Sequence, residues 1–177
     1  RADDIATTAD QLGITTEALQ KYRYIAMQTD VAEESLSKAI VKLNGDIGNL
    51  ALGIQDDGNK ALLALIGTFK NADGTIKSSE QVFEEVIAAL SKMEDQATRT
   101  GLANKIFGER FGKELNPLIN QGIEAWNRYS KEFEEVGFIS DDNIEKIGEL
   151  DNKMNEMRAI FDQIGSEIAI DLMPLFE

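Results

Sequence analysis

The sequence predicts an all-α protein, a multi-helix bundle or array of about six to eight helices with one long C-terminal helix. Apolar residues make up 42% of the 177 residues, which is enough for a hydrophobic core. Proline occurs only twice, at Pro117 and Pro174, and strong helix formers fill the stretches between turn signals. Within those stretches apolar side chains recur at steps of three and four residues, the spacing of one helical face.

The first 30 residues predict one weak and one clear helix. Residues 1–11 carry little pattern, although Ile5, Ala9 and Leu12 would line one face before Gly13 ends the helix. Thr15 or Thr16 then caps a helix over about 16–29.

Asp30 is the expected N-cap of the next helix, whose apolar stripe spans most of 32–54. Glycines at 45 and 48 weaken that helix, so a kink or an early end is expected near Asn44. A nearly all-apolar run at 61–69 predicts a short buried helix. The stripe residues are Leu36, Ile40, Leu43, Ile47, Leu50 and Ile54.

A single clear loop is expected at about 70–78, where Asp73-Gly74 supplies a tight turn. Ser78 or Ser79 caps a helix to about 94, and a further helix runs over about 96–107. A polar patch with two glycines follows, and Pro117 is then the first residue of a helix that Gly137 stops. Its apolar face is Leu118, Ile119, Ile123, Trp126, Tyr129 and Phe133.

The chain therefore divides into a helical region at 1–136 and a long C-terminal helix within 137–177. That helix, expected over about 140–172, carries a heptad stripe and reads as the start of a longer coiled segment of the parent protein. An ordinary bundle helix and a seam for self-association or a neighbouring chain both fit the pattern. The candidate partner-binding residues are Ile147, Leu150, Met154, Met157, Phe161, Ile164 and Ile168.

Composition argues against catalysis and against nucleic-acid recognition. The chain has no histidine and no cysteine, which removes the usual proton shuttles, thiol nucleophiles and zinc ligands. A net charge of −14 with scattered cations repels phosphates. No apolar run approaches the roughly 20 residues of a membrane span. We therefore expect no enzyme, cofactor, small-molecule substrate or membrane segment, although carboxylate pairs by themselves have no specificity.

Two local patterns have both a functional and a structural interpretation. Asn71, Asp73 and Glu80 fall at ligand positions of an EF-hand-like loop, but Phe69 stands at its first position and Lys77 at its ninth. A structural turn is the preferred interpretation, and no metal site is assigned. Similarly, the aromatic face at 126–133 could stack bases or sugars, yet core packing is favoured because the same face continues from aliphatic residues.

Several segments in order resemble the phage tail tape-measure protein family, over nearly all of the chain. Two segments depart from the family's pattern: Phe111-Gly112-Lys113 is bulkier than the usual linker, and Asn116 replaces an apolar residue. The segments are ADQLGITTEALQ at 9–20, Tyr24, Asn71–Gly74, EEVIAALSKM at 84–93, IFG at 106–108, LNPLINQG at 115–122 and Ile139-Ser140.

The resemblance implies a helical module of a longer protein whose length sets that of the tail, a reading that also suits a chain opening with Arg1. Its implied partners are other copies of the tape-measure protein, tail-tube subunits and tail assembly chaperones. Its implied place is the tube lumen of the virion tail, assembled in the bacterial host cytoplasm, with roles in tail-tube assembly and genome ejection.

Two other functions remain open from the sequence. A stand-alone helical adaptor would accept a partner helix in an apolar groove. A carboxylate enzyme would need a cleft that holds two acids with separated pKa values.

Overall fold

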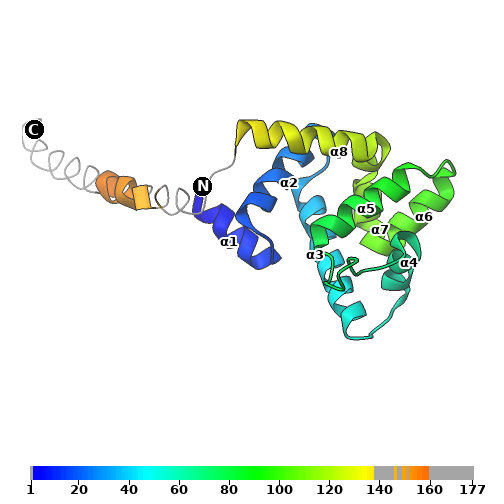
Figure 1. Cartoon of the computed structure of the whole chain (residues 1–177). Coiled ribbons are helices and arrows are strands. Elements are labelled where there is room, and N and C mark those ends of the chain that lie inside the picture. Colours follow the sequence, from blue (N-terminus) through cyan, green and yellow to red (C-terminus); the bar gives the residue numbers. More distant parts are fainter. Residues whose placement is uncertain (1, 138–145, 147–148, 151, 160–177) are drawn as a thin grey trace, which may run out of the picture.

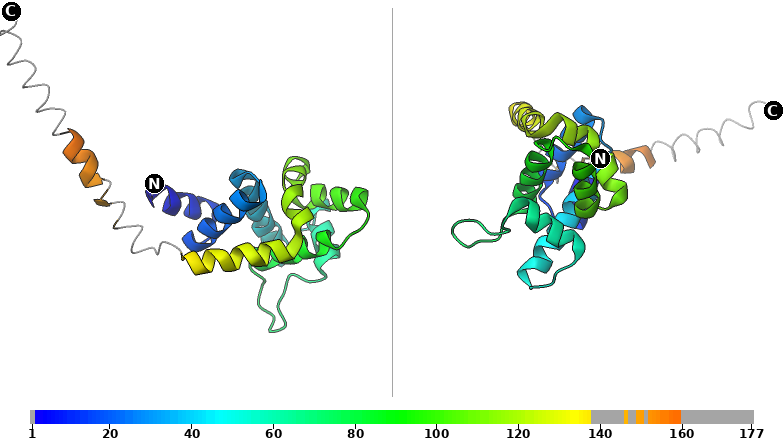
Figure 2. Two further views of the ribbon diagram at one scale, coloured as in Figure 1. Left: turned by 90° about the horizontal axis from the view of Figure 1, so that it is seen from above. Right: turned by 90° about the vertical axis from the view of Figure 1, so that its right-hand side faces the viewer.

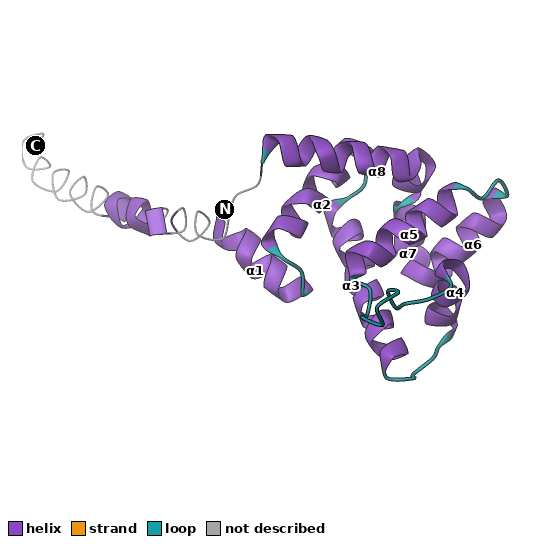
Figure 3. Ribbon diagram, viewed as in Figure 1, coloured by secondary structure: helices purple, strands orange, loops and turns teal. Residues whose placement is uncertain are grey.

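The computed structural model describes residues 2–137, 146, 149–150 and 152–159, and it confirms the all-α fold class (Figure 1). Within those residues the regular structure is helical, apart from one isolated β-bridge between Lys70 and Ile76 (Figure 3). The helices of the body are α1 Ala2–Leu12, α2 Thr16–Thr29, α3 Glu33–Ala51, α4 Asp57–Ile66, α5 Ser79–Ser91, α6 Gln96–Phe107, α7 Glu109–Glu114 and α8 Asn116–Val136.

Aromatic rings at the centre of the body join helices that are distant in sequence. The ring of Trp126 on α8 lies 5.8 Å from that of Tyr22 on α2 and 5.0 Å from that of Phe83 on α5. Phe107 at the end of α6 lies 5.9 Å from Phe83. These side chains are fully buried, so the core interpretation of Trp126 is confirmed and that residue is no stacking platform.

The predicted stripe of α3 forms the other side of this core. Leu36, Ile40 and Leu43 are fully buried, and the helix runs through Gly45 and Gly48 without the expected kink. Packing of the buried face compensates for the weak helix propensity of the glycines. Ile54 lies beyond the end of the helix and is 53% exposed, so the stripe ends at Leu50.

The starts of α3 and α4 differ from the sequence prediction. Asp30 is not the N-cap of α3 but the C-cap of α2, in the left-handed conformation at φ 57°. Asp tolerates that conformation better than most residues, and Ala32 begins α3 without a side-chain cap. The run at 61–69 was expected to be buried, but α4 covers Asp57–Ile66 and only Leu62 among its apolar residues is fully buried.

The region around the glycines at 108, 112 and 122 was only partly predicted. The patch after Gly108 forms the short helix α7, which crosses α6 so closely that Gly112 lies against Ala103 and Asn104. Pro117 sits in the first turn of α8 as expected. Gly122, at φ 77° and ψ −172°, interrupts that helix, so the face expected from Leu118 to Phe133 belongs to two helical pieces joined by a kink.

The Asp-Gly loop projects from the body between α4 and α5 (Figure 2). Gly74 has φ 85°, as the predicted turn requires. Ser78 then starts α5 with a capping box, because its hydroxyl accepts from the Gln81 N–H while the Gln81 side chain accepts from the Ser78 N–H. The loop and the start of the following helix are therefore confirmed.

Candidate partner-binding surfaces

The heptad stripe near the C-terminus is the first candidate surface, and the structure describes three of its residues. Leu150, Met154 and Met157 are 58%, 47% and 55% exposed. Residues 152–159 are helical and every one of them is exposed. The other stripe residues, Ile147, Phe161, Ile164 and Ile168, lie outside the described residues, as does most of the expected long helix. We call the described residues from 146 to 159 the stripe segment.

Charges flank the exposed stripe in an ordered way. Within the helical residues 152–159, at 100° between residues, Lys153 lies along one edge of the face formed by Met154 and Met157, and Arg158 lies along the other. Glu156 lies further round this helix, beyond the edge that carries Lys153. Among the described residues, the apolar face is therefore bordered by cations, in a chain whose net charge is −14.

A second surface, which the sequence did not indicate, is a hollow of about 500 Å³ between α1 and the start of α3. We call it the α1–α3 groove. Its lining is mainly apolar, and the Ser37 hydroxyl is buried there without a hydrogen-bond partner. The lining residues are Thr8, Leu12, Ala32, Glu33, Glu34, Ser37 and Lys38. The weak pattern of residues 1–11 gave no reason to place a helix against α3.

Ion pairs fix the rim of the groove. Arg23 on α2 pairs with Glu33 and lies 3.8 Å from a carboxylate oxygen of Asp4, so it connects α1 with the start of α3. Lys38 pairs with Glu34 one turn away on the same helix, at 2.6 Å. The side-chain hydrogen bond from Lys38 lowers the pKa of the Glu34 carboxyl, which keeps this part of the rim ionised.

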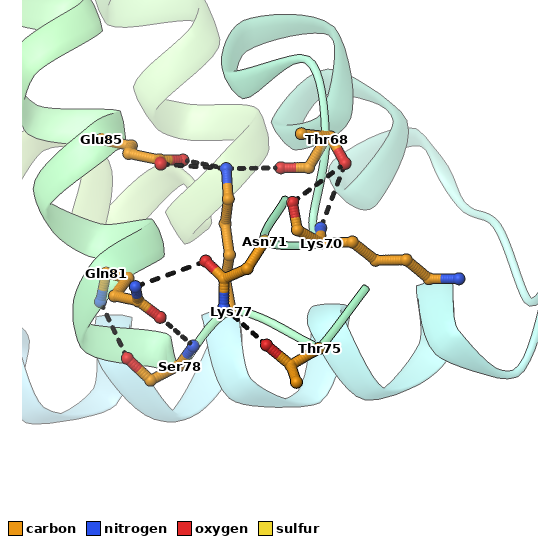
Figure 4. A network of polar contacts seen from close by, with 8 residues as sticks. All are labelled: Thr68, Lys70, Asn71, Thr75, Lys77, Ser78, Gln81 and Glu85. Carbon is orange, nitrogen blue, oxygen red and sulfur yellow. Dashed lines mark hydrogen bonds and ion pairs between the residues drawn. The ribbon is translucent and has the colours of Figure 1, made fainter. Parts of the chain in front are cut away.

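Lys77 organises the loop that carries the EF-hand-like pattern (Figure 4). The Lys77 ammonium donates to the Thr68 carbonyl at 3.0 Å and to the Glu85 carboxylate at 2.9 Å. Its side chain is only 11% exposed. This half-buried lysine ties both ends of the loop to α5.

The three candidate calcium ligands do not come together in this structure. Asp73 accepts hydrogen bonds from the Thr75 N–H and hydroxyl, at 2.9 and 2.6 Å. The Asn71 side chain also donates to the Thr75 hydroxyl, whereas Glu80 pairs with Lys21 on α2. Within the described part of the chain, no three residues of the His, Cys, Asp and Glu types gather as a metal site would need.

Where a carboxyl pKa is shifted among the described residues, it is lowered. Hydrogen bonds from Ser35 and Arg110 lower the pKa of Glu114, and hydrogen bonds from Thr98 lower that of Asp95. Each carboxyl shift resolved in the described residues is downward, whereas a general acid needs a raised pKa. These acids are suited to capping and ion pairing.

The buried polar groups of the core serve packing. The Trp126 indole N–H donates to Glu84 at 2.9 Å, which satisfies the one polar atom of that side chain. Burial, with the nearby charges of Glu80 and Glu84, strongly raises the pKa of the Tyr22 hydroxyl and keeps it protonated.

Comparison with family models, curated proteins and solved structures gives no match. In addition, no helix among the described residues is both long and apolar enough to cross a membrane. Any functional assignment therefore rests on the sequence pattern and on the two surfaces described above.

Proposed function

We propose that this chain is a structural module of a phage tail tape-measure protein, the protein that sets tail length during assembly. The observation that carries the proposal is the series of segments from ADQLGITTEALQ at 9–20 to Ile139-Ser140, which occur in the order of that family. The partners are then other copies of the tape-measure protein, tail-tube subunits and tail assembly chaperones. The module acts inside the tail tube and is associated with tail-tube assembly and genome ejection.

Three features of the chain support a structural role. Helices make up the body, an apolar stripe remains exposed at Leu150, Met154 and Met157, and histidine and cysteine are absent from the sequence. The excess of acids also suits a lumen that DNA later crosses, because an anionic lining does not bind phosphates. The helical body and the exposed apolar stripe favour side-by-side association of helices.

Tail length tests the proposal directly. Deleting whole heptads between 147 and 167 from the intact parent protein should shorten the tails of assembled phage. We expect the loss to grow with the number of deleted residues, up to about 1.5 Å for each, the rise of an α-helix. Electron micrographs of many tails give the mean length.

A substitution of equal length is the matched control. Leu150→Ala with Met154→Ala alters the stripe and keeps the number of residues, so tail length should stay constant. Tails of unchanged length in the deletion phage would contradict the ruler function.

The α1–α3 groove favours one alternative function, a helical adaptor that recognises a partner helix. Its apolar lining and its volume of about 500 Å³ are suited to a few apolar side chains of such a helix. The length and genetic neighbourhood of the parent separate the two functions. A parent of several hundred residues encoded beside tail-tube genes supports the ruler, whereas a stand-alone chain of about this size supports the adaptor.

A further inference from the structure

A hollow of about 370 Å³ is lined by the turn that joins α1 to α2, by the first turns of α2 and by the start of α5. We call it the α2–α5 hollow. Its lining is mainly apolar, and Asp10 and Tyr22 are among its polar residues. We propose that the hollow binds an uncharged amide group, whose carbonyl accepts from the Tyr22 hydroxyl while its N–H donates to the Asp10 carboxylate. This inference does not depend on the tape-measure proposal.

The Tyr22 hydroxyl is a donor without an acceptor in the described part of the chain. Tyr22 is 1% exposed, and its ring centre lies 5.8 Å from that of Trp126, so the ring belongs to the core. Its hydroxyl takes part in none of the side-chain hydrogen bonds among the described residues, whereas the Tyr24 hydroxyl donates to Glu132 at 3.2 Å. A buried donor without an acceptor is costly. Because Tyr22 lines the hollow, a molecule that enters it can supply the missing acceptor.

The charges around the hollow oppose an anionic acceptor. Burial and the nearby carboxylates of Glu80 and Glu84 raise the pKa of Tyr22, so its hydroxyl keeps the hydrogen that it donates. Lys21 pairs with Glu80, but Asp10 takes part in none of the ion pairs among the described residues. A carboxylate or phosphate in the hollow would therefore be repelled by Asp10 at short range. The acceptor that suits Tyr22 is a neutral one.

A second cation is not required, because the chain supplies its own. The Lys21 ammonium lies 6.0 Å from the centre of the Tyr22 ring and neutralises Glu80. A ligand ammonium could accept no hydrogen from the Tyr22 hydroxyl, since an ammonium group has donors only. The unpaired donor would then stay unpaired.

Among neutral acceptors, the lining favours an amide over a polyol. A polyol would bury several hydroxyls against Ile14 and Ala18, where they would lack partners. An amide instead has its acceptor and its donor on one planar group, and alkyl arms that cover apolar walls. The N–H groups of Ser79 and Glu80 begin α5 and have no partner within the helix, so they add donors for the carbonyl oxygen.

Probes of matched size test the chemistry of the ligand. In NMR titrations of the full chain, butyramide should shift the backbone amide signals of residues 13–18 and 79–80. It should bind about tenfold more tightly than butyrate, butylammonium or n-butanol. The isomer N-ethylacetamide carries a secondary amide, so the tighter of the two amides tells a side-chain amide from a backbone amide as the natural source. A non-amide probe that binds as tightly as the better amide would overturn the proposal.

A pair of tyrosine variants tests the donor. Tyr22→Phe should weaken butyramide binding by about tenfold, yet its urea midpoint should not fall, because the lost hydroxyl has no partner in the free chain. Tyr24→Phe is the matched control, since it removes a hydroxyl that bonds Glu132 outside the hollow and should leave binding unchanged. Unchanged binding by Tyr22→Phe, or a larger loss of stability than in Tyr24→Phe, would contradict the assignment of the donor.

A pair of aspartate variants tests the selectivity against anions. Asp10→Asn removes the unpaired charge, so the preference for butyramide over butyrate should fall by about tenfold. Asp57→Asn removes the same charge from the first turn of α4, which does not line the hollow, and should keep the preference. The same preference in both variants would show that Asp10 does not face the ligand and would overturn the site.

Discussion

Gly112 has no side chain, and this allows α7 to pack closely against α6. A Cβ at this position would lie 2.8 Å from the Asn104 nitrogen and 2.9 Å from the Ala103 carbonyl carbon. Because both are backbone atoms of α6, neither can move without shifting the helix. The departure of Phe111-Gly112-Lys113 from the family's usual linker therefore falls where α6 and α7 touch.

We predict that Gly112→Ala lowers the free energy of unfolding by about 1–3 kcal/mol, the usual cost of overpacking. Gly101→Ala is the matched control, because this glycine lies inside α6 with no other atom within 4 Å of the added Cβ. In the control, the free energy of unfolding should rise by up to about 1 kcal/mol, because alanine has a higher helix propensity than glycine. Urea denaturation followed by the fluorescence of the buried Trp126, the single tryptophan, measures both. Equal midpoints for the two variants would contradict the close packing.

At the scale of elements, side-chain caps start several helices of the body. Asp95 accepts from the Thr98 N–H at 2.9 Å and begins α6, while Thr15, Asp56 and Ser78 begin α2, α4 and α5 in the same way. The hydrogen bonds from Thr98 lower the pKa of the Asp95 carboxyl, since they favour its charged form.

The lowered pKa predicts how the cap of α6 responds to pH. A carboxyl with a depressed folded-state pKa stabilises the fold above its unfolded pKa of about 3.9, and this contribution is lost as the pH falls through the lower folded value. Asp95→Asn should therefore be less stable than the wild type at pH 7, and the difference should shrink towards pH 3. Thermal denaturation across this range measures it. Glu94→Gln removes the same charge from the adjacent residue as a control, and a pH-independent difference for Asp95→Asn would contradict the prediction.

The errors of sequence reasoning also fall at the scale of elements. Thr15, Ser78 and Pro117 mark helix starts through their own side chains or ring, so these boundaries were predicted. Asp30 is a good N-cap by type, but its place in the chain makes it a left-handed C-cap. At the Gly122 kink, an added Cβ would lie only 3.2 Å from the Cβ of Ser91 on α5. No local pattern contains that neighbour.

At the scale of the whole molecule, the excess of acids opposes compaction. With 32 acidic and 18 basic side chains, like charges repel across the folded surface, and salt screens that repulsion. We predict that the melting temperature rises between about 0.1 M and 1 M NaCl at pH 7, as the Debye length falls from about 10 Å to about 3 Å.

The control for this effect is the same titration near the isoelectric point. At a pH close to 4.4 the net charge approaches zero, so the rise with salt should be much smaller. Differential scanning calorimetry provides the melting temperatures. A melting temperature that falls with salt at pH 7 would mean that attractive ion pairs outweigh the net repulsion.

The sequence by itself determined the fold class, most helix starts and the burial of the α3 stripe, because these follow from local chemistry and from a repeat of three and four residues. It also placed Leu150, Met154 and Met157 on one face, yet it left open what covers that face. Only the tertiary structure decided that the EF-hand-like loop is held by Lys77, that Trp126 belongs to the core, and that α1 and α3 leave a groove between them. The physical reason is that a loop ligand, a core contact and a groove each depend on residues far apart in sequence, whose approach no local pattern encodes.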